Sequence, residues 1–209
     1  DYEIRWFTPT VEVDLCGHAT LASAHVVFEK LEPGRSMVRF HSHRSGALSV
    51  QKSGELLELD FPRREFRSID PIEDLANALG GIQPQAQFLS SSNTLIVLLR
   101  DENEVKHCQP DFAAIKKLGR CVAITASANQ DCDFVSRYFA PTHGIDEDPV
   151  TGSSFCYLAP FWAEKLGKTV LLAHQVSKRG GEVRCRLSGD RVKIAGSTAL
   201  YLEGSIRIR

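Results

Sequence analysis

The sequence lacks several features that mark specialised classes of protein. Its 209 residues carry 25 basic and 26 acidic side chains, so the formal charge is −1 and no basic excess is available to bind a phosphate backbone. No apolar run approaches the ~20 residues that cross a bilayer, and the first residues do not resemble a signal peptide. These absences argue against nucleic acid and membranes as partners.

The sequence also lacks paired cysteines and metal-ligand spacings. Its six cysteines are scattered without the regular pattern of a disulfide framework or a zinc site. The histidines and aspartates offer no metal site either, and nothing in the sequence supports a Ser-His-Asp triad. We therefore expect a cytoplasmic protein with free thiols and no metal site.

What the sequence does contain is a repeat of its own pattern. The segment IRWFTPTVEVDLCGHATLASAHVVFEKL near the N-terminus resembles SRYFAPTHGIDEDPVTGSSFCYLAPFWAEKL in the second half. Arg5 recurs as Arg137 at an offset of 132 residues, and Gly17 recurs as Gly152 at an offset of 135. Two copies of one supersecondary unit, facing each other across a cleft, would explain this pattern.

Strand signals dominate the remainder of the chain, and short polar and apolar runs are separated by Ser-Gly turns. The predicted strands cover residues 38–43, 47–51, 56–61, 121–127, 169–176, 182–187, 191–195 and 199–208, with a hairpin over 87–89 and 94–99. Helical periodicity is clearest directly after Gly17 and after Gly152, and a short helix is expected over 111–118. Pro160 inside the second long helix predicts a kink.

These patterns predict an α+β fold of two pseudo-symmetric lobes, each a curved, barrel-like, mostly antiparallel sheet around a central helix. Residues 1–68 would form the N-terminal lobe, 69–200 the C-terminal lobe, and 201–209 a terminal strand that returns to the N-terminal lobe. About fifty residues (87–136) precede Arg137 in the second copy, whereas only four precede Arg5. We therefore expect the first lobe to lack its first strands, and its open strand edges favour a homodimer.

Each of the two equivalent glycines lies between an extended segment and a helix. The first amides of a helix have no partner within it and favour a negatively charged oxygen. Two such helix starts, brought together by the repeat, would hold the carboxylate of a small acidic substrate. The predicted substrate-binding residues at these helix starts are Cys16, Gly17, Ala19, Thr151, Gly152 and Ser154.

His18, Asp148 and Ser153 are the candidates for catalysis. An imidazole and a carboxylate from opposite lobes could exchange protons with opposite parts of a small molecule. Purely local roles are the alternative: His18 could bond within its helix start, and Asp148 could stabilise a helix N-terminus or a stiff Asp-Pro turn. Cys16, a thiol at a helix N-terminus, could act as base or nucleophile. Its counterpart is Thr151, however, so a mechanism with two thiols is not available.

At these residues the chain resembles the PhzF-like family of phenazine-biosynthesis-type isomerases, which share the diaminopimelate epimerase fold. The resemblance is carried by RWFTPTVEVDLCGHATLASAHVVF, by RYFAPTHGIDEDPVTGSS with the following LAPFWA, and by SKRGGEV followed by RVKIAG. It covers essentially the whole chain. The resemblance implies a cofactor-free isomerase that moves a proton on a small acidic substrate, with His18, Asp148 and Ser153 lining its site.

The chain departs from this family pattern in one respect. The resemblance implies a glutamate in an N-terminal Asn-Leu-Ser-Glu-Thr-like segment as the principal general acid and base, and no such segment occurs here. We therefore expect little or no turnover from this chain alone. Cys16 and Thr151 occupy the places where the related epimerases carry their catalytic cysteines. Two alternatives stay open: a non-catalytic ligand- or protein-binding member of the fold, and a Cys16-dependent amino-acid epimerase.

Overall fold

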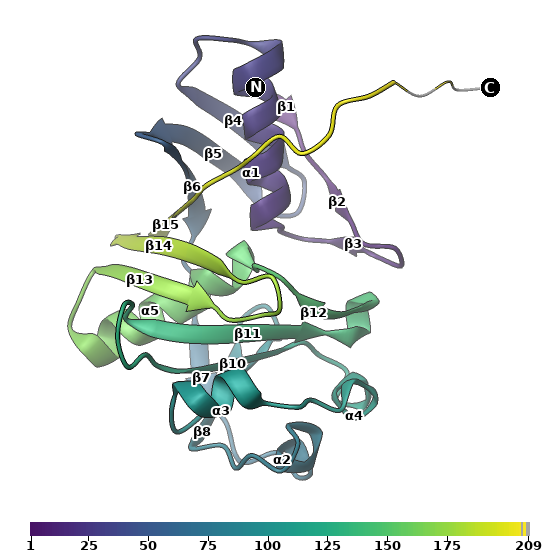
Figure 1. The fold of residues 1–209 in the computed structure, drawn as a ribbon, viewed down its shortest axis with the longest axis vertical. Helices are drawn as coiled ribbons and strands as arrows, with labels where there is room; N and C mark the ends of the chain where they lie inside the picture. Colours follow the sequence, from purple (N-terminus) through teal and green to yellow (C-terminus); the bar gives the residue numbers. More distant parts are fainter. Residues whose placement is uncertain (206, 208–209) are drawn as a thin grey trace.

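The computed structural model describes residues 1–205 and 207, and these contain one large mixed sheet and a few helices (Figure 1). The strands of the first part are β1 (Tyr2–Glu3), β2 (Trp6–Phe7), β3 (Glu12–Val13), β4 (Met37–Ser42), β5 (Gly46–Ser53) and β6 (Leu56–Pro62). The later strands are β7 (Phe66–Ser68), β8 (Ala86–Ser90), β9 (Leu95–Leu98), β10 (Val122–Ser127), β11 (Phe134–Ala140), β12 (Ile145–Asp148), β13 (Val170–Gln175), β14 (Gly181–Ser188) and β15 (Arg191–Gly196).

The helices are fewer and mostly short. They are α1 (Gly17–Val26) with its π-helical continuation η1 (Val27–Leu31), α2 (Leu75–Ala78), α3 (Glu102–His107), α4 (Phe112–Lys117) and α5 (Phe155–Leu166), with 3₁₀ turns η2 (Pro141–His143) and η3 (Gly152–Ser154). The sheet order is β1-β4-β5-β6-β15-β14-β13-β11-β10-β9-β8-β7, with β12 on β11 and a separate β2–β3 pair. Most of these pairs are antiparallel, which confirms the predicted α+β class.

Alternating side chains explain why the strands bury one face against the helices. In β6, Leu57, Leu59 and Phe61 are buried while the residues between them are half-buried. Side chains of a strand point to opposite faces in turn, so these three residues share the inner face. Helix α1 packs on β5 and β6, and α5 packs on β13, β14 and β15. Both long helices are therefore wrapped by sheet, as Figure 1 shows.

Helix α5 is deeply buried over its first nine residues, because every residue from Phe155 to Ala163 is enclosed. Pro160 has no N–H to donate to the carbonyl of Cys156, the acceptor four residues earlier. The backbone N–H of Arg64 donates to that carbonyl instead, at 2.9 Å. The proline therefore leaves an acceptor that fastens the segment between β6 and β7 to the helix.

The two halves of the chain share a single sheet, and the seam between them is the antiparallel β6–β15 pair. Asp60 on β6 accepts hydrogen bonds from Arg191 Nε (2.6 Å) and from Lys193, both on β15. Strand β7 lies within the range predicted for the N-terminal lobe, yet it pairs with β8 of the second half. The chain thus crosses between the halves at residues 63–65, before the predicted boundary at 68.

The terminal segment corrects one predicted strand. No strand forms over the described part of 199–208, which is 199–205 and 207, and the rest of that prediction lies outside the described residues. The tail lies along α1 instead (Figure 1), where His25 Nδ1 and the Thr198 hydroxyl are 3.0 Å apart and Lys30 pairs with Glu203 at 2.8 Å. Leu200, Tyr201 and Leu202 remain exposed, so these residues bury no apolar face against the sheet.

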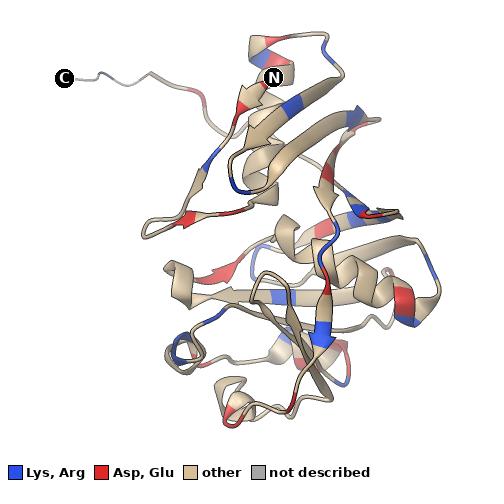
Figure 2. Cartoon of the chain, turned by 180° about the vertical axis from the view of Figure 1, so that it is seen from behind, with Lys and Arg blue, Asp and Glu red and all other residues tan. Residues whose placement is uncertain are grey.

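The charged side chains are mixed in sign over both halves. Figure 2 shows lysines and arginines interspersed with aspartates and glutamates along the ribbon. None of the helices formed by the described residues has the length and apolar character needed to cross a membrane.

Candidate active site

The two helix starts that the sequence singles out touch each other through their glycines. A Cβ atom added to Gly17 would lie 2.6 Å from the Cα of Gly152, and one added to Gly152 would lie 2.7 Å from the Cα of Gly17. Real Cβ atoms do not approach backbone that closely, so only glycine fits at either position. This contact brings the first turn of α1 against the η3 turn that leads into α5.

The start of α1 is held by a chain of buried hydrogen bonds. Cys16 is the extended N-cap residue, and its carbonyl accepts both the backbone N–H of Thr20 (3.2 Å) and the Thr20 hydroxyl (2.6 Å). The indole N–H of Trp6 on β2 donates to the same hydroxyl oxygen at 3.2 Å. Because these groups are fixed, the amides of the first helical turn keep a constant direction.

The second helix start is fixed by Gln175, which is 1% exposed at the end of β13. Its side-chain oxygen accepts the backbone N–H of Thr151 (2.7 Å), and its amide nitrogen donates to the carbonyl of Asp148 (2.6 Å). The Thr151 hydroxyl in turn donates to the Asp148 carboxylate at 2.6 Å. Thr151, the counterpart of Cys16 in the repeat, therefore orients the Asp148 carboxylate.

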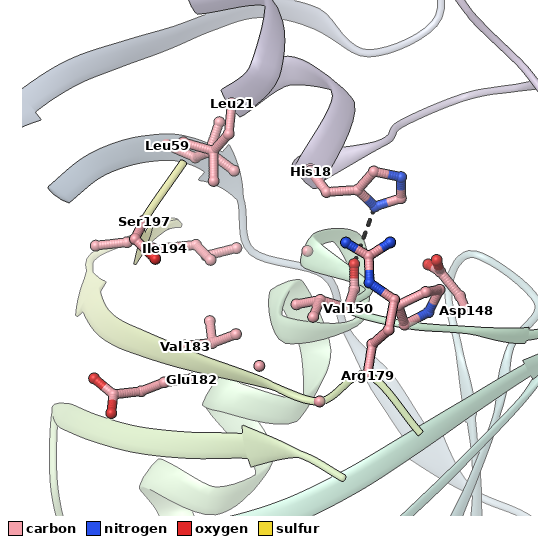
Figure 3. Close-up of a pocket in the computed structure, with 17 residues that line it drawn as sticks. His18, Leu21, Leu59, Asp148, Val150, Arg179, Glu182, Val183, Ile194 and Ser197 are labelled. Carbon is pink, nitrogen blue, oxygen red and sulfur yellow. Dashed lines mark hydrogen bonds between the residues drawn. The ribbon is translucent and has the colours of Figure 1, made fainter. Parts of the chain in front are cut away.

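His18 connects the two halves and has a defined orientation. Its Nδ1 lies 3.0 Å from the carbonyl oxygen of Val150, which can only accept, so Nδ1 carries a proton (Figure 3). Its Nε2 lies 3.5 Å from the sulfur of Cys16. The Cys16 sulfur, helped by the Asp148 charge and the Val150 carbonyl, raises the pKa of His18 to about 9 against the opposing effect of burial. His18 is therefore a proton donor at neutral pH.

Asp148 is half-buried at the end of β12, on the other half of the chain. Burial raises the pKa of its carboxyl group, and the hydrogen bond from Thr151 and the positive charge of His18 only partly offset this. A carboxylate whose pKa is raised is a better proton acceptor than an ordinary surface aspartate. Asp148, a proton acceptor, and His18, a proton donor, thus face the same cavities from opposite halves of the chain.

Two neighbouring cavities share Gly17, His18, Asp148 and Gly152 in their walls. The Cys16 cavity, of about 390 Å³, is also lined by Cys16, Ala19, Tyr138, Thr151 and Ser153. The Arg179 cavity, of about 430 Å³, is also lined by Leu21, Leu59, Val150, Arg179, Val183 and Ile194. Figure 3 shows the Arg179 cavity, with apolar side chains on one part of its wall and His18, Asp148 and Arg179 on another.

Most of the predicted site residues therefore lie around the Cys16 cavity, but Ser154 does not. Its side chain is 1% exposed, and its hydroxyl donates to the carbonyl of Thr151 at 2.7 Å within the same turn. Its backbone N–H also bonds to that carbonyl. Ser154 is corrected to a residue that stabilises the η3 turn, because both of its donors are used there.

Sequence reasoning missed four residues that shape the site. Gln175 could have been noticed as a polar residue at the end of an apolar strand, and Arg179 as the start of the Arg-Gly-Gly motif. Gly181 of that motif is required because a Cβ there would meet Val150 at 2.4 Å. For Tyr138, on β11, the sequence shows only the pattern of a strand and nothing that indicates a site.

Structural comparison places this fold among epimerases. A hydroxyproline epimerase from Agrobacterium vitis superposes with a TM-score of 0.60 over 95% of this chain and 68% of its own, at 10% identity. A PhzF-family phenazine biosynthesis protein from Enterococcus faecalis superposes with a TM-score of 0.90, at 40% identity, over 99% of this chain and 78% of its own. The diaminopimelate epimerase-like fold predicted from the sequence is thereby confirmed.

Sequence comparison adds the family. Residues 1–204 match the phenazine biosynthesis-like protein family, and an uncharacterized isomerase from Pseudomonas aeruginosa is 51% identical over 99% of this chain and 78% of its own length. The chain belongs to the phenazine biosynthesis-like (PhzF) family. Relatives described as isomerases support an isomerase class for it.

Proposed function

We propose that this protein is an isomerase that shifts a proton on a small carboxylate-bearing metabolite by general acid and base chemistry, without a cofactor. The observation that carries this proposal is the contact between Gly17 and Gly152. It brings two helix starts together beside an imidazolium and a carboxylate. Backbone amides of a helix start favour an anion, so they supply a place for the substrate carboxylate.

The charged states of the two side chains assign their roles. Asp148 takes the proton from the substrate carbon next to its acidic group, and the electron pair left behind is stabilised by the nearby amides. His18, protonated at neutral pH, supplies a proton elsewhere on the same molecule. One proton leaves and one arrives, so the composition of the substrate is unchanged, as an isomerisation requires. Ser153 lines the same cavity and offers a hydroxyl to the substrate.

A second candidate is proton transfer by the Cys16 thiol. It is favoured by the 3.5 Å separation between the Cys16 sulfur and His18 Nε2, which is short enough for a proton to pass between the two groups. Replacing Cys16 by Ser separates the two proposals below pH 6.5, where His18 is protonated with or without the sulfur. Loss of solvent deuterium exchange into amino acids supports the thiol, and unchanged exchange supports Asp148 and His18.

The main test measures proton exchange in the longest natural form of the protein that contains this sequence. Small carboxylates are incubated in deuterated water and followed by NMR. His18→Asn and Asp148→Asn should each slow exchange about 10²- to 10⁴-fold, the usual contribution of a general acid or base. The matched controls are His25→Asn on the same helix and Asp146→Asn, an exposed neighbour. Normal exchange in either site variant would overturn the proposed roles.

A further inference from the structure

A third cavity, of about 210 Å³, lies beside the Cys16 cavity and takes no part in the proposed chemistry. We call it the Arg64 pocket. Its walls come from both halves of the chain, and the residues used below are Asp14, Arg64, Arg120, Cys121, His143 and Tyr157. Its lining is rich in polar and basic side chains.

Arg64 and Arg120 supply positive charge that nothing nearby neutralises. Among the described residues, neither guanidinium group has a hydrogen-bond or ion-pair partner. Asp14 also lines the pocket, but its carboxylate is paired with Arg44 at 3.1 Å. The backbone of Arg64 is fixed by its bond to the carbonyl of Cys156. Two half-buried guanidinium groups in one pocket repel each other unless an anion lies between them.

Tyr157 provides the independent sign of a missing ligand. Its side chain is 2% exposed, and its hydroxyl has no hydrogen-bond partner within the part of the chain that the structure describes. Buried hydroxyl groups are nearly always paired, because an unpaired one costs about 1–3 kcal/mol. Burial raises the pKa of Tyr157, so the hydroxyl stays protonated and can donate.

A cysteine and a histidine complete the wall. The Cys121 sulfur lies 3.6 Å from Nδ1 of His143. The Cys121 sulfur raises the pKa of His143, and the Asp14 charge adds to this, while burial opposes it. Against the effect of burial, His143 and Thr142 lower the pKa of the Cys121 thiol, so the charge of the imidazole is matched within this pair and the two groups add polar partners to the wall.

The Arg64 pocket adjoins the Cys16 cavity. The two share a set of wall residues, which are Val13, Leu15, Tyr138, His143 and Ser153. A ligand whose first acidic group lies at the two helix starts could therefore place a second group here. An oxyanion that enters the protein separately could also reach this position.

We propose that the Arg64 pocket binds a second oxyanion, a carboxylate or a phosphate group, through Arg64, Arg120 and the Tyr157 hydroxyl. Its two sources are the distal acidic group of the substrate and a free inorganic oxyanion. Only the first source rests on the proposed function. Arginine fits either group, because its planar fork of donors matches the oxygens of both.

The experiment compares succinate, butyrate and inorganic phosphate by isothermal titration calorimetry. Succinate carries two carboxylates and butyrate one on a chain of equal length. Succinate should bind at least about tenfold more tightly, since hydrogen bonds to charged groups contribute this much or more. Arg64→Gln and Arg120→Gln should each remove that advantage. Arg63→Gln is the matched control, because Arg63 is the exposed neighbour and does not line the pocket.

Whether inorganic phosphate binds identifies the source of the oxyanion. Binding of phosphate that is lost in Arg64→Gln and retained in Arg63→Gln supports the pocket with a free oxyanion. A succinate advantage without phosphate binding supports it with the substrate as source. Equal binding of succinate and butyrate without phosphate binding overturns the proposal, as does equal loss in Arg63→Gln and Arg64→Gln.

Tyr157→Phe gives a test that a loss of folding cannot imitate. Because it removes an unpartnered hydroxyl, the midpoint of thermal unfolding should stay the same or rise, while affinity for the oxyanion falls severalfold. A lower midpoint with unchanged affinity contradicts the proposal. His18→Asn separates it from the isomerase proposal, since this variant should lose proton exchange and keep phosphate binding wherever phosphate binds the unaltered chain.

Discussion

At the scale of single residues, the reciprocal contact of Gly17 and Gly152 leaves no room for a side chain at either position. Gly17→Ala places a methyl group 2.6 Å from backbone, and backbone can yield only by separating the two helix starts. We expect a loss of about 1–3 kcal/mol in the free energy of unfolding, measured in urea. Gly196→Ala is the control, because its nearest new contacts are an ordinary 3.9 Å, and it should change stability little.

The protonation of His18 is a second prediction at this scale. Its pKa of about 9 in the folded protein exceeds the ordinary value of 6.5. Its contribution to stability is therefore fully present below pH 6.5 and is lost as the pH rises through 9. NMR titration of the His18 ring should show this pKa, and Cys16→Ser should lower it, since the Cys16 sulfur is the main cause. An ordinary pKa near 6.5 in the unaltered chain contradicts this account.

Sequence could identify these residues but not their bonds. The repeat singles out the glycines and places His18 and Asp148 beside them. It cannot show that Ser154 turns its hydroxyl inward, because a serine at a helix start can either face a ligand or cap the turn. Gln175 is noticeable as a polar residue at the end of an apolar strand, but its hydrogen bonds could not be predicted, since its partners lie 24 and 27 residues away in the chain.

At the scale of elements, the start of α1 depends on Thr20. Thr20→Val keeps the side-chain shape but removes the hydroxyl that bonds the Cys16 carbonyl and accepts the Trp6 indole N–H. We expect a loss of about 1–3 kcal/mol, because a buried donor is left without a partner. Ser23→Ala on the same helix is the control, since its hydroxyl bonds only the carbonyl of Ala19 four residues earlier. Equal losses in both variants would show that the bond from Trp6 is unimportant.

The elements themselves were largely predictable, because strand and helix periodicities are local. The hairpin of β8 and β9 and the buried strand β10 are confirmed. The predicted strand fails over the described residues 199–205 and 207 for a physical reason: the alternating pattern is typical of a strand, but a strand also needs a partner with free backbone groups. Sequence pattern gives no information on that partner.

At the scale of the whole molecule, the β6–β15 seam is held by Asp60 between two cations. Asp60→Asn should destabilise the protein by about 1–3 kcal/mol at pH 7, because Arg191 and Lys193 lose their counter-charge. Hydrogen bonds from these cations lower the pKa of Asp60 below its usual range, although burial opposes them. The stabilisation is thus present above the ordinary pKa near 3.8 and is lost as pH falls through the lower folded value. Urea unfolding at pH 7 and pH 3 should show the difference shrinking, and a constant difference would contradict this assignment.

The bond from His18 to Val150 has a consequence for how such an enzyme would cycle. Its donor belongs to one half of the chain and its acceptor to the other, so any widening that admits or releases a ligand must break it. With the halves apart, the imidazole loses the carbonyl that fixes its tautomer and part of what makes it retain a proton. Separation of the halves would thus free the orientation of the ring, while the Cys16 sulfur, which lies on the same half, would still favour the protonated imidazole.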